Sequence, residues 1–386
     1  MTSLLLTAAL SASSALAQDH SHASAVRIAF ADARNHTLGV LDLETGKVVA
    51  SFGTPGKISG IYPVPGGQYA MAIHRDHNRV TVLHSGYSAV DHGDHKDLLE
   101  GAPYVLQTLN TGRQPTHYWA HGDHIAVVND QDGTVAVLDR NLLGVSLDFQ
   151  EIKTEAPDHS AAVVLGDKVL NGYSKLAKVD AYNLADGALA ASFPGCPSLH
   201  GEATLGKTAA FGCSDGVLMI RENQGQLVAH KISNPAGTPA NTRVSTLAAH
   251  DGAPVMLGNF GQGLALIDPV RNSLTPVPLP ANPIKFDFAQ GGRSIVVLTA
   301  DGQLNRLGLN GQPIARVAVT APYDSRVQDA PRPSMAVMDG VAFVSHPGAG
   351  EVLEVSLEDL QVKRRHQVGG TPTALTVLSL EGALKH

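Results

Sequence analysis

Short runs of alternating apolar and polar residues follow one another from Val26 almost to the end of the chain. The runs are bounded by Gly, Asp, Asn and Pro, and a 3.6-residue period is nearly absent. A period of two is typical of β-strands, whereas amphipathic helices repeat every 3.6 residues. The sequence therefore predicts an all-β protein with very little helix.

The predicted strands recur as one unit: a short first strand, a Gly/Asp hairpin, a second strand rich in Val, Ala and Leu, a polar turn, and a third strand that often ends near Asp. Seven copies are complete, over residues 58–84, 116–139, 158–182, 199–221, 243–268, 283–307 and 332–356. An eighth is divided, with its later strands in 26–52 and its first strand in 371–380.

The spacing of about 44 residues is the period of four-stranded propeller blades. We therefore predict one domain over 26–380, an eight-bladed β-propeller closed by pairing the N- and C-terminal strands in one blade. A seven-bladed propeller is the alternative if one unit is degenerate. Residues 381–386 are expected to form a C-terminal tail.

The N-terminus carries a predicted export signal. Residues 4–17 are apolar or small and end in Ala-Leu-Ala, which is typical of a secretory signal peptide cleaved near Ala17. The mature chain would begin with a flexible arm, 18–25, that contains His20 and His22. No other stretch reaches the roughly 18 apolar residues that span a bilayer, so we expect no membrane insertion.

Cys196 and Cys213 are the only cysteines. An even pair in an exported protein predicts a disulfide, and zinc ligation by the two thiolates is the alternative.

Composition adds one functional clue. The formal net charge is -7 and no basic cluster is visible, which argues against a nucleic-acid partner. Histidine is unusually frequent, with 18 residues against 28 Lys and Arg, and 11 of the 18 lie in the first 124 residues. Imidazole is a common metal ligand, so the positions of these histidines on the predicted blades decide whether several can share one metal ion.

His117, His159 and His200 occupy the same repeat position, the start of the innermost strand in three consecutive blades. That position lies at the mouth of the channel, so the three imidazoles should converge there as a tetrahedral zinc site with one further ligand. The alternative is that each histidine only caps its strand. The possible fourth ligands are His74 and His346, with Asp76, Asp158 and Glu202 also nearby.

Two His-Gly-Asp-His clusters are expected on the opposite rim. His92, Asp94 and His95 belong to an insertion after the third strand of one blade, where mixed imidazoles and carboxylates favour a secondary metal site. His121 and His124 flank a hairpin in the next blade, where Gly-Asp is also ordinary turn chemistry. His20 and His22 could transfer metal or belong to a solubilising tail.

The joint occurrence of an exported propeller, an N-terminal His-x-His, the His-Gly-Asp-His insertion, one Cys pair and channel histidines resembles the AztD-type periplasmic zinc metallochaperones. The resemblance covers essentially the whole mature chain. It implies a monomeric, non-enzymatic zinc carrier of the periplasm that passes Zn²⁺ directly to the solute-binding protein of a zinc ABC importer.

Two other functions fit a propeller. Three histidines with an open position also describe a catalytic zinc site, but no Ser-His-Asp order, H-E-x-x-H or Gly-rich phosphate loop is visible. A surface interaction propeller without a channel site is the other alternative. Copper could replace zinc on imidazole ligands, but the six Met form no Met-rich motif that would favour Cu(I).

Overall fold

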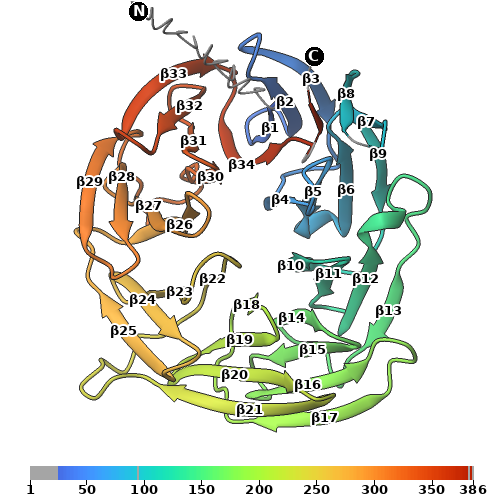
Figure 1. Ribbon diagram of the computed structural model, residues 1–386, viewed down its shortest axis with the longest axis vertical. Coiled ribbons are helices and arrows are strands. Elements are labelled where there is room, and N and C mark those ends of the chain that lie inside the picture. Colours follow the sequence, from blue (N-terminus) through green and yellow to red (C-terminus); the bar gives the residue numbers. More distant parts are fainter. Residues whose placement is uncertain (1–24, 94, 381–382, 385–386) are drawn as a thin grey trace, which may run out of the picture.

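Eight four-stranded antiparallel sheets are arranged around a central axis in the computed structural model, which describes residues 25–93, 95–380 and 383–384 (Figure 1). The predicted eight-bladed β-propeller is confirmed. In the described part of the chain the only helical elements are two 3-10 turns, η1 (Arg75–His77) and η2 (Arg140–Leu142).

Each blade places its first strand nearest the axis and its fourth strand at the rim (Figure 1). From inside to outside, blade 1 contains β34 (Pro372–Leu378), β1 (Arg27–Asp32), β2 (Thr37–Asp42) and β3 (Lys47–Gly53); blade 2 contains β4 (Gly60–Pro63), β5 (Tyr69–His74), β6 (Arg79–His84) and β9 (Tyr104–Leu109). Blade 3 contains β10 (Pro115–His121), β11 (His124–Asn129), β12 (Thr134–Asp139) and β13 (Gln150–Lys153); blade 4 contains β14 (Ser160–Leu165), β15 (Lys168–Tyr173), β16 (Lys178–Asn183) and β17 (Leu189–Pro194).

The second half of the ring repeats this order. Blade 5 contains β18 (Glu202–Leu205), β19 (Thr208–Cys213), β20 (Gly216–Asn223) and β21 (Gln226–Ser233); blade 6 contains β22 (Leu247–Ala248), β23 (Met256–Phe260), β24 (Gly263–Asp268) and β25 (Ser273–Val277). Blade 7 contains β26 (Pro283–Ala289), β27 (Ser294–Thr299), β28 (Gln303–Gly308) and β29 (Pro313–Ala318); blade 8 contains β30 (Met335–Met338), β31 (Val341–His346), β32 (Glu351–Ser356) and β33 (Gln361–Gln367).

The ring closes in blade 1, as predicted. β34 pairs antiparallel with β1, so that Arg27 lies opposite Leu378 and Phe30 opposite Leu375. The Asp32 carboxylate also accepts a hydrogen bond from the backbone N–H of Thr371, at 2.9 Å. The two ends of the domain are therefore joined by a strand pair, which leaves no open first strand at the closure.

The hydrophobic core lies between blades. β19 and β27 are buried at every residue, because each middle strand is covered on both faces by the neighbouring blades. The outer strands β3 and β17 are mostly exposed, with partly buried residues at alternate positions toward their ends. This explains why middle strands contain continuous apolar runs, and it makes each blade dependent on its two neighbours.

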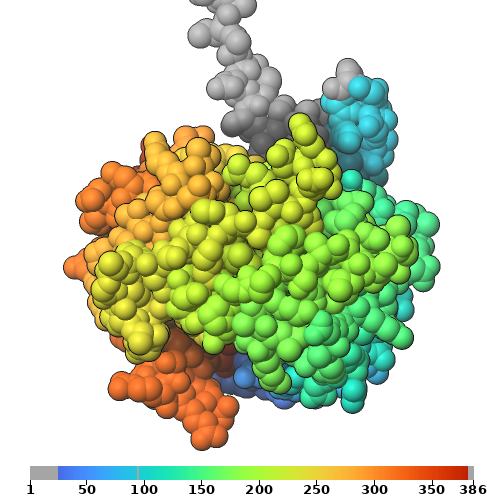
Figure 2. All heavy atoms as spheres, turned by 90° about the horizontal axis from the view of Figure 1, so that it is seen from below, coloured from blue at the N-terminus to red at the C-terminus, as the bar shows by residue number. Residues whose placement is uncertain are grey.

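An insertion follows the third strand of blade 2. It forms the hairpin β7 (Tyr87–Asp91) and β8 (Lys96–Glu100), which projects from the ring in Figure 2 (cyan). Part of the predicted C-terminal tail joins it, because β35 (Ala383–Leu384) pairs in parallel with β8. The insertion is thus a small three-stranded sheet outside the propeller.

Candidate metal centre

His117, His159 and His200 meet at the inner edge of blades 3, 4 and 5. His117 is the third residue of β10, His159 directly precedes β14, and His200 lies two residues before β18, three strands that are neighbours around the axis (Figure 1). One ligand atom from each residue lies within 4.8 Å of the other two. The ring centroids form a nearly equilateral triangle, with separations of 5.0, 5.1 and 4.9 Å. We call these three residues the His triad.

The Nε2 atoms of His117 and His159 face each other at 3.4 Å. The opposite ring nitrogens face acceptors: His159 Nδ1 lies 2.8 Å from Asp130 Oδ2, and His117 Nδ1 lies 3.2 Å from Glu202 Oε2. This arrangement places a carboxylate behind two of the three rings.

The third ring is oriented by backbone. His200 Nδ1 lies 2.5 Å from the Ser245 carbonyl oxygen, which can only accept a hydrogen bond. The Nδ1 atom therefore carries the hydrogen, and in the neutral ring the Nε2 lone pair is left available. Metal-binding histidines are commonly held in this way, with the second nitrogen donating to a carboxylate or carbonyl.

Buried negative charge surrounds the His triad. The side chains of Asp130 and Glu202 are only 6% and 7% exposed, and Asp130 Oδ1 has no hydrogen-bond partner in the described part of the protein. Burial acts to lower the pKa of His117, but the Glu202 and Asp130 carboxylates outweigh it and leave that pKa raised. For His200, burial and then the neighbouring His117 lower the pKa. Two buried carboxylates beside neutral imidazoles would balance the charge of a divalent cation.

The predicted disulfide is confirmed and supports the His200 segment. Cys196 and Cys213 are bonded, and both are fully buried. Cys213 ends β19, and the residue before it, Gly212, accepts a hydrogen bond from the His200 N–H at 2.9 Å. The disulfide therefore joins the chain entering blade 5 to the strand that holds the His200 backbone.

The candidate fourth ligands lie outside the His triad. His74 is fully buried, with its Nε2 2.9 Å from Thr81 Oγ1. His346 Nδ1 accepts the N–H of Ala349 within its own turn. Asp158 accepts the N–H of Lys175. Among the histidines and carboxylates described, the group that meets at this point consists of the three histidines alone.

Two other members of the predicted set make different contacts. Asp76 forms an ion pair with Arg75 at 3.6 Å, and Glu202 faces the Nδ1 side of His117. Asp130 and Ser245 were not predicted from the sequence. Asp130 directly follows β11, on the same face as the triad, so a polar residue at the end of a second strand was the available signal.

A second group lies in the insertion. His92 Nε2 and His95 Nε2 lie 3.1 and 3.2 Å from the two oxygens of Asp97, and the two rings are stacked at 5.1 Å. We call these three residues the insertion cluster. The carboxylate described in this cluster is Asp97, which was not among the predicted ligands. Asp94 lies outside the described residues, as do His20 and His22.

His121 and His124 do not join the insertion cluster. They pair across the β10–β11 hairpin, and the ring of His121 lies 6.2 Å from that of Trp119.

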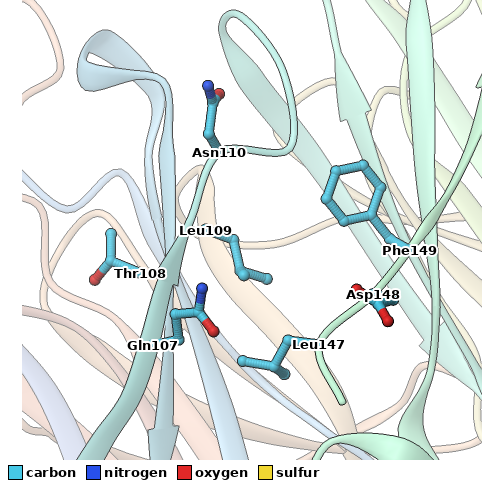
Figure 3. Close-up of a pocket in the computed structure, with 7 residues that line it drawn as sticks. All are labelled: Gln107, Thr108, Leu109, Asn110, Leu147, Asp148 and Phe149. Carbon is cyan, nitrogen blue, oxygen red and sulfur yellow. The ribbon is translucent and has the colours of Figure 1, made fainter.

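A separate cavity of about 390 Å³ lies at the outer edge, between the end of β9 and the segment that leads to β13 (Figure 3). Leu109 and Leu147 extend into the space between the two segments (Figure 3). Asp148 is the one ionisable residue in its lining, so this cavity lacks a set of metal ligands.

Comparison with known proteins agrees with this architecture. The zinc chaperone AztD of Citrobacter koseri is 27% identical over 384 residues, which cover 93% of this chain and 88% of the relative. A crystal structure of C. koseri AztD has a TM-score of 0.85 at 25% identity, covering 94% of this chain and 100% of the other. The resemblance to the AztD zinc chaperones is confirmed.

The match to AztD extends over the whole propeller, because 94% coverage leaves no room to omit a blade. The dihydro-heme d1 dehydrogenase NirN has a TM-score of 0.61 at 13% identity, covering 92% of this chain and 75% of that one, a similarity that shows the fold alone. No protein-family model matches the chain. Within the described residues, no helix is long and apolar enough to cross a membrane.

Proposed function

We propose that this protein is an exported zinc carrier that holds Zn²⁺ at the His triad and passes it directly to the solute-binding protein of a zinc ABC importer in the periplasm. The observation that carries the proposal is the triad itself. Three imidazoles from three blades each bring one ligand nitrogen within 4.8 Å of the others, while acceptors hold Nδ1 of His159 and of His200. The similarity to a protein named as a zinc chaperone supports zinc as the ion.

The position of the carboxylates favours a carrier over a zinc enzyme. A hydrolytic zinc site needs a general base directed at the metal-bound water. Asp130 and Glu202 instead contact Nδ1 of His159 and His117, on the opposite side of each ring from the Nε2 atoms that face each other. Their geometry suits the orientation and charge compensation of ligands.

Direct transfer requires ligands that can exchange one at a time. An ion held by the His triad would leave slowly if every bond had to break before a new one formed. A further imidazole that enters as one triad histidine departs keeps the coordination number constant and lowers the barrier. We assign this role to His20 and His22 of the N-terminal arm, with the insertion cluster as a secondary site on the opposite rim.

Stopped-flow transfer of zinc to the metal-free solute-binding protein tests this proposal. Deleting residues 18–24, or the double change His20→Ala and His22→Ala, should slow transfer while tight affinity stays unchanged. Loss of zinc to a small chelator that reaches the channel should change little. His230→Ala, in the outer strand β21, is the matched control because this histidine is exposed.

The results discriminate between the alternatives. Equal transfer rates with and without the arm would make it a tail. Transfer that is no faster than spontaneous release to the chelator would contradict direct handover. A change in equilibrium affinity would make the arm part of the main site.

A further inference from the structure

A large cavity lies at the mouth of the channel, on the face of the propeller where the first strands begin. Its volume is about 1080 Å³, and its lining comes from blades 1, 2, 6, 7 and 8 and the loops beside them. Blades 3, 4 and 5, which carry the His triad, contribute none of the described lining residues. We call this space the mouth cavity.

The mouth cavity is rich in positive charge. Its lining includes three acidic residues and five basic ones, namely Arg34, Lys57, Arg75, Lys285 and Arg332. Arg75 forms an ion pair with Asp76. The other four form no ion pair with any described residue, although the protein as a whole carries a net charge of -7. Five cations against three carboxylates, gathered in a concave space of an acidic protein, favour an anionic ligand.

The mouth cavity adjoins the His triad. Ser245 is part of its lining, and the Ser245 carbonyl accepts a hydrogen bond from His200 Nδ1. Arg75 Nε donates to Thr116 Oγ1, one residue before His117, at 3.3 Å. Tyr62, also in the lining, stacks on Tyr118 at 4.8 Å. The cavity therefore borders the triad on two sides, beside His117 and beside His200.

The ligand class follows from charge and spacing. The four cations without an ion pair come from blades 1, 2, 7 and 8, so one compact ion cannot contact all of them. A molecule with several carboxylates can, and carboxylate oxygen is the group that pairs with Lys and Arg and also ligates zinc.

We propose that the mouth cavity binds a small organic polycarboxylate, with one carboxylate directed at the His triad and the others on the basic residues. The part of this inference that concerns zinc rests on the proposed function, whereas anion binding does not. In the zinc-loaded protein the anion would occupy the coordination position that three histidines leave open.

Isothermal titration of the full mature protein with tricarballylate tests the inference. This tricarboxylate lacks the hydroxyl of citrate and chelates zinc weakly in solution. We expect binding to the metal-free protein and tighter binding to the zinc-loaded protein. The double change Lys57→Gln and Lys285→Gln should weaken it at least tenfold. Lys47→Gln with Lys153→Gln is the matched control, because both lysines are exposed on strands remote from the axis.

Each outcome is decisive. Absence of binding, or binding that the Lys57/Lys285 variant leaves unchanged, would overturn the inference. Inorganic phosphate or acetate binding as tightly as tricarballylate would overturn the assignment to polycarboxylates. If tricarballylate binds but the triad fails to bind zinc, the proposed function fails and the anion site stands. If zinc binds and tricarballylate does not, only this inference fails.

Discussion

The His triad and the insertion cluster use similar side chains in opposite ways. In the triad the carboxylates contact Nδ1 of His117 and His159, and the Nε2 atoms of these two rings face each other. In the insertion cluster the single carboxylate, Asp97, contacts both Nε2 atoms. In the triad a metal ion could bind ring nitrogens that no carboxylate occupies. In the insertion cluster it would first have to displace the contacts between Asp97 and the two Nε2 atoms.

The two groups also differ in what holds them. The triad histidines come from three blades, so their positions depend on the packed propeller. His92 and His95 lie on one hairpin outside the ring, with side chains 47% and 37% exposed. Ligands fixed by the packing of three blades lose little freedom on binding, whereas ligands on a hairpin outside the ring must be ordered. The comparison therefore predicts a tight site in the channel and a weak one in the insertion.

Alanine substitution should separate the two sites by the largest margin. Structural zinc sites with four ligands have a binding free energy of about 10–16 kcal/mol, shared among those ligands. Loss of one triad histidine should therefore weaken zinc affinity on the order of 100-fold or more. His92→Ala with His95→Ala should leave that affinity within a few-fold. Competition with a chromophoric chelator measures both. Full affinity in the variant with all three triad histidines replaced would place the tight site elsewhere.

Removing the disulfide should lower the stability of the protein and weaken zinc binding at the triad. The bond closes a loop with a sequence separation of 17, for which a chain-entropy model gives roughly 3 kcal/mol of stability. Cys196→Ala with Cys213→Ala should lower the free energy of unfolding by about that amount and weaken zinc binding through His200. Denaturant titration checks the first effect. Unchanged unfolding would mean that blade 5 holds its entry segment without the bond.

Much of this arrangement follows from the repeat. Because His117, His159 and His200 share one position in consecutive units, a propeller brings them together whatever the details of packing. The disulfide between Cys196 and Cys213 was also predicted from the sequence. Contacts that depend on the direction of a side chain could not be derived from the repeat.

His74 shows why. It ends a second strand on the triad face, but its ring turns into the blade toward Thr81. Asp130 and Ser245 act across a blade boundary, on histidines of a neighbouring repeat. In the insertion, the strand register decides that Asp97 meets both histidines. Such contacts depend on rotamers and on the packing of adjacent blades, which alternation along one strand does not encode.

The carboxylates behind the triad should have the next largest effect. Groups that orient metal ligands typically contribute 10–100-fold to affinity. Asp130→Asn and Glu202→Gln should each weaken triad binding within that range and leave the insertion cluster unaffected. Glu222→Gln, which removes a carboxylate paired with Lys207 near the end of β20, is the matched control. Unaltered zinc affinity in both Asp130→Asn and Glu202→Gln would mean that these carboxylates stabilise the fold without supporting the metal ligands.

The pH at which zinc affinity begins to fall should also depend on these carboxylates, and this is the smallest effect expected. Burial acts to lower the pKa of His117, but Glu202 and Asp130 outweigh it, so the metal-free ring keeps its proton to a higher pH than an ordinary imidazole, whose pKa is about 6.5. Zinc must displace that proton once the pH falls below the raised pKa. Affinity should therefore decline from a pH above about 6.5, by about tenfold per unit for each proton displaced. Glu202→Gln removes the largest cause of the raised His117 pKa. The decline in zinc affinity should therefore begin at a lower pH in this variant. Its affinity at neutral pH should still be weaker than that of the unaltered protein. Chelator competition at a series of pH values measures both onsets, and identical onsets would show that the carboxylate orients His117 without controlling its proton.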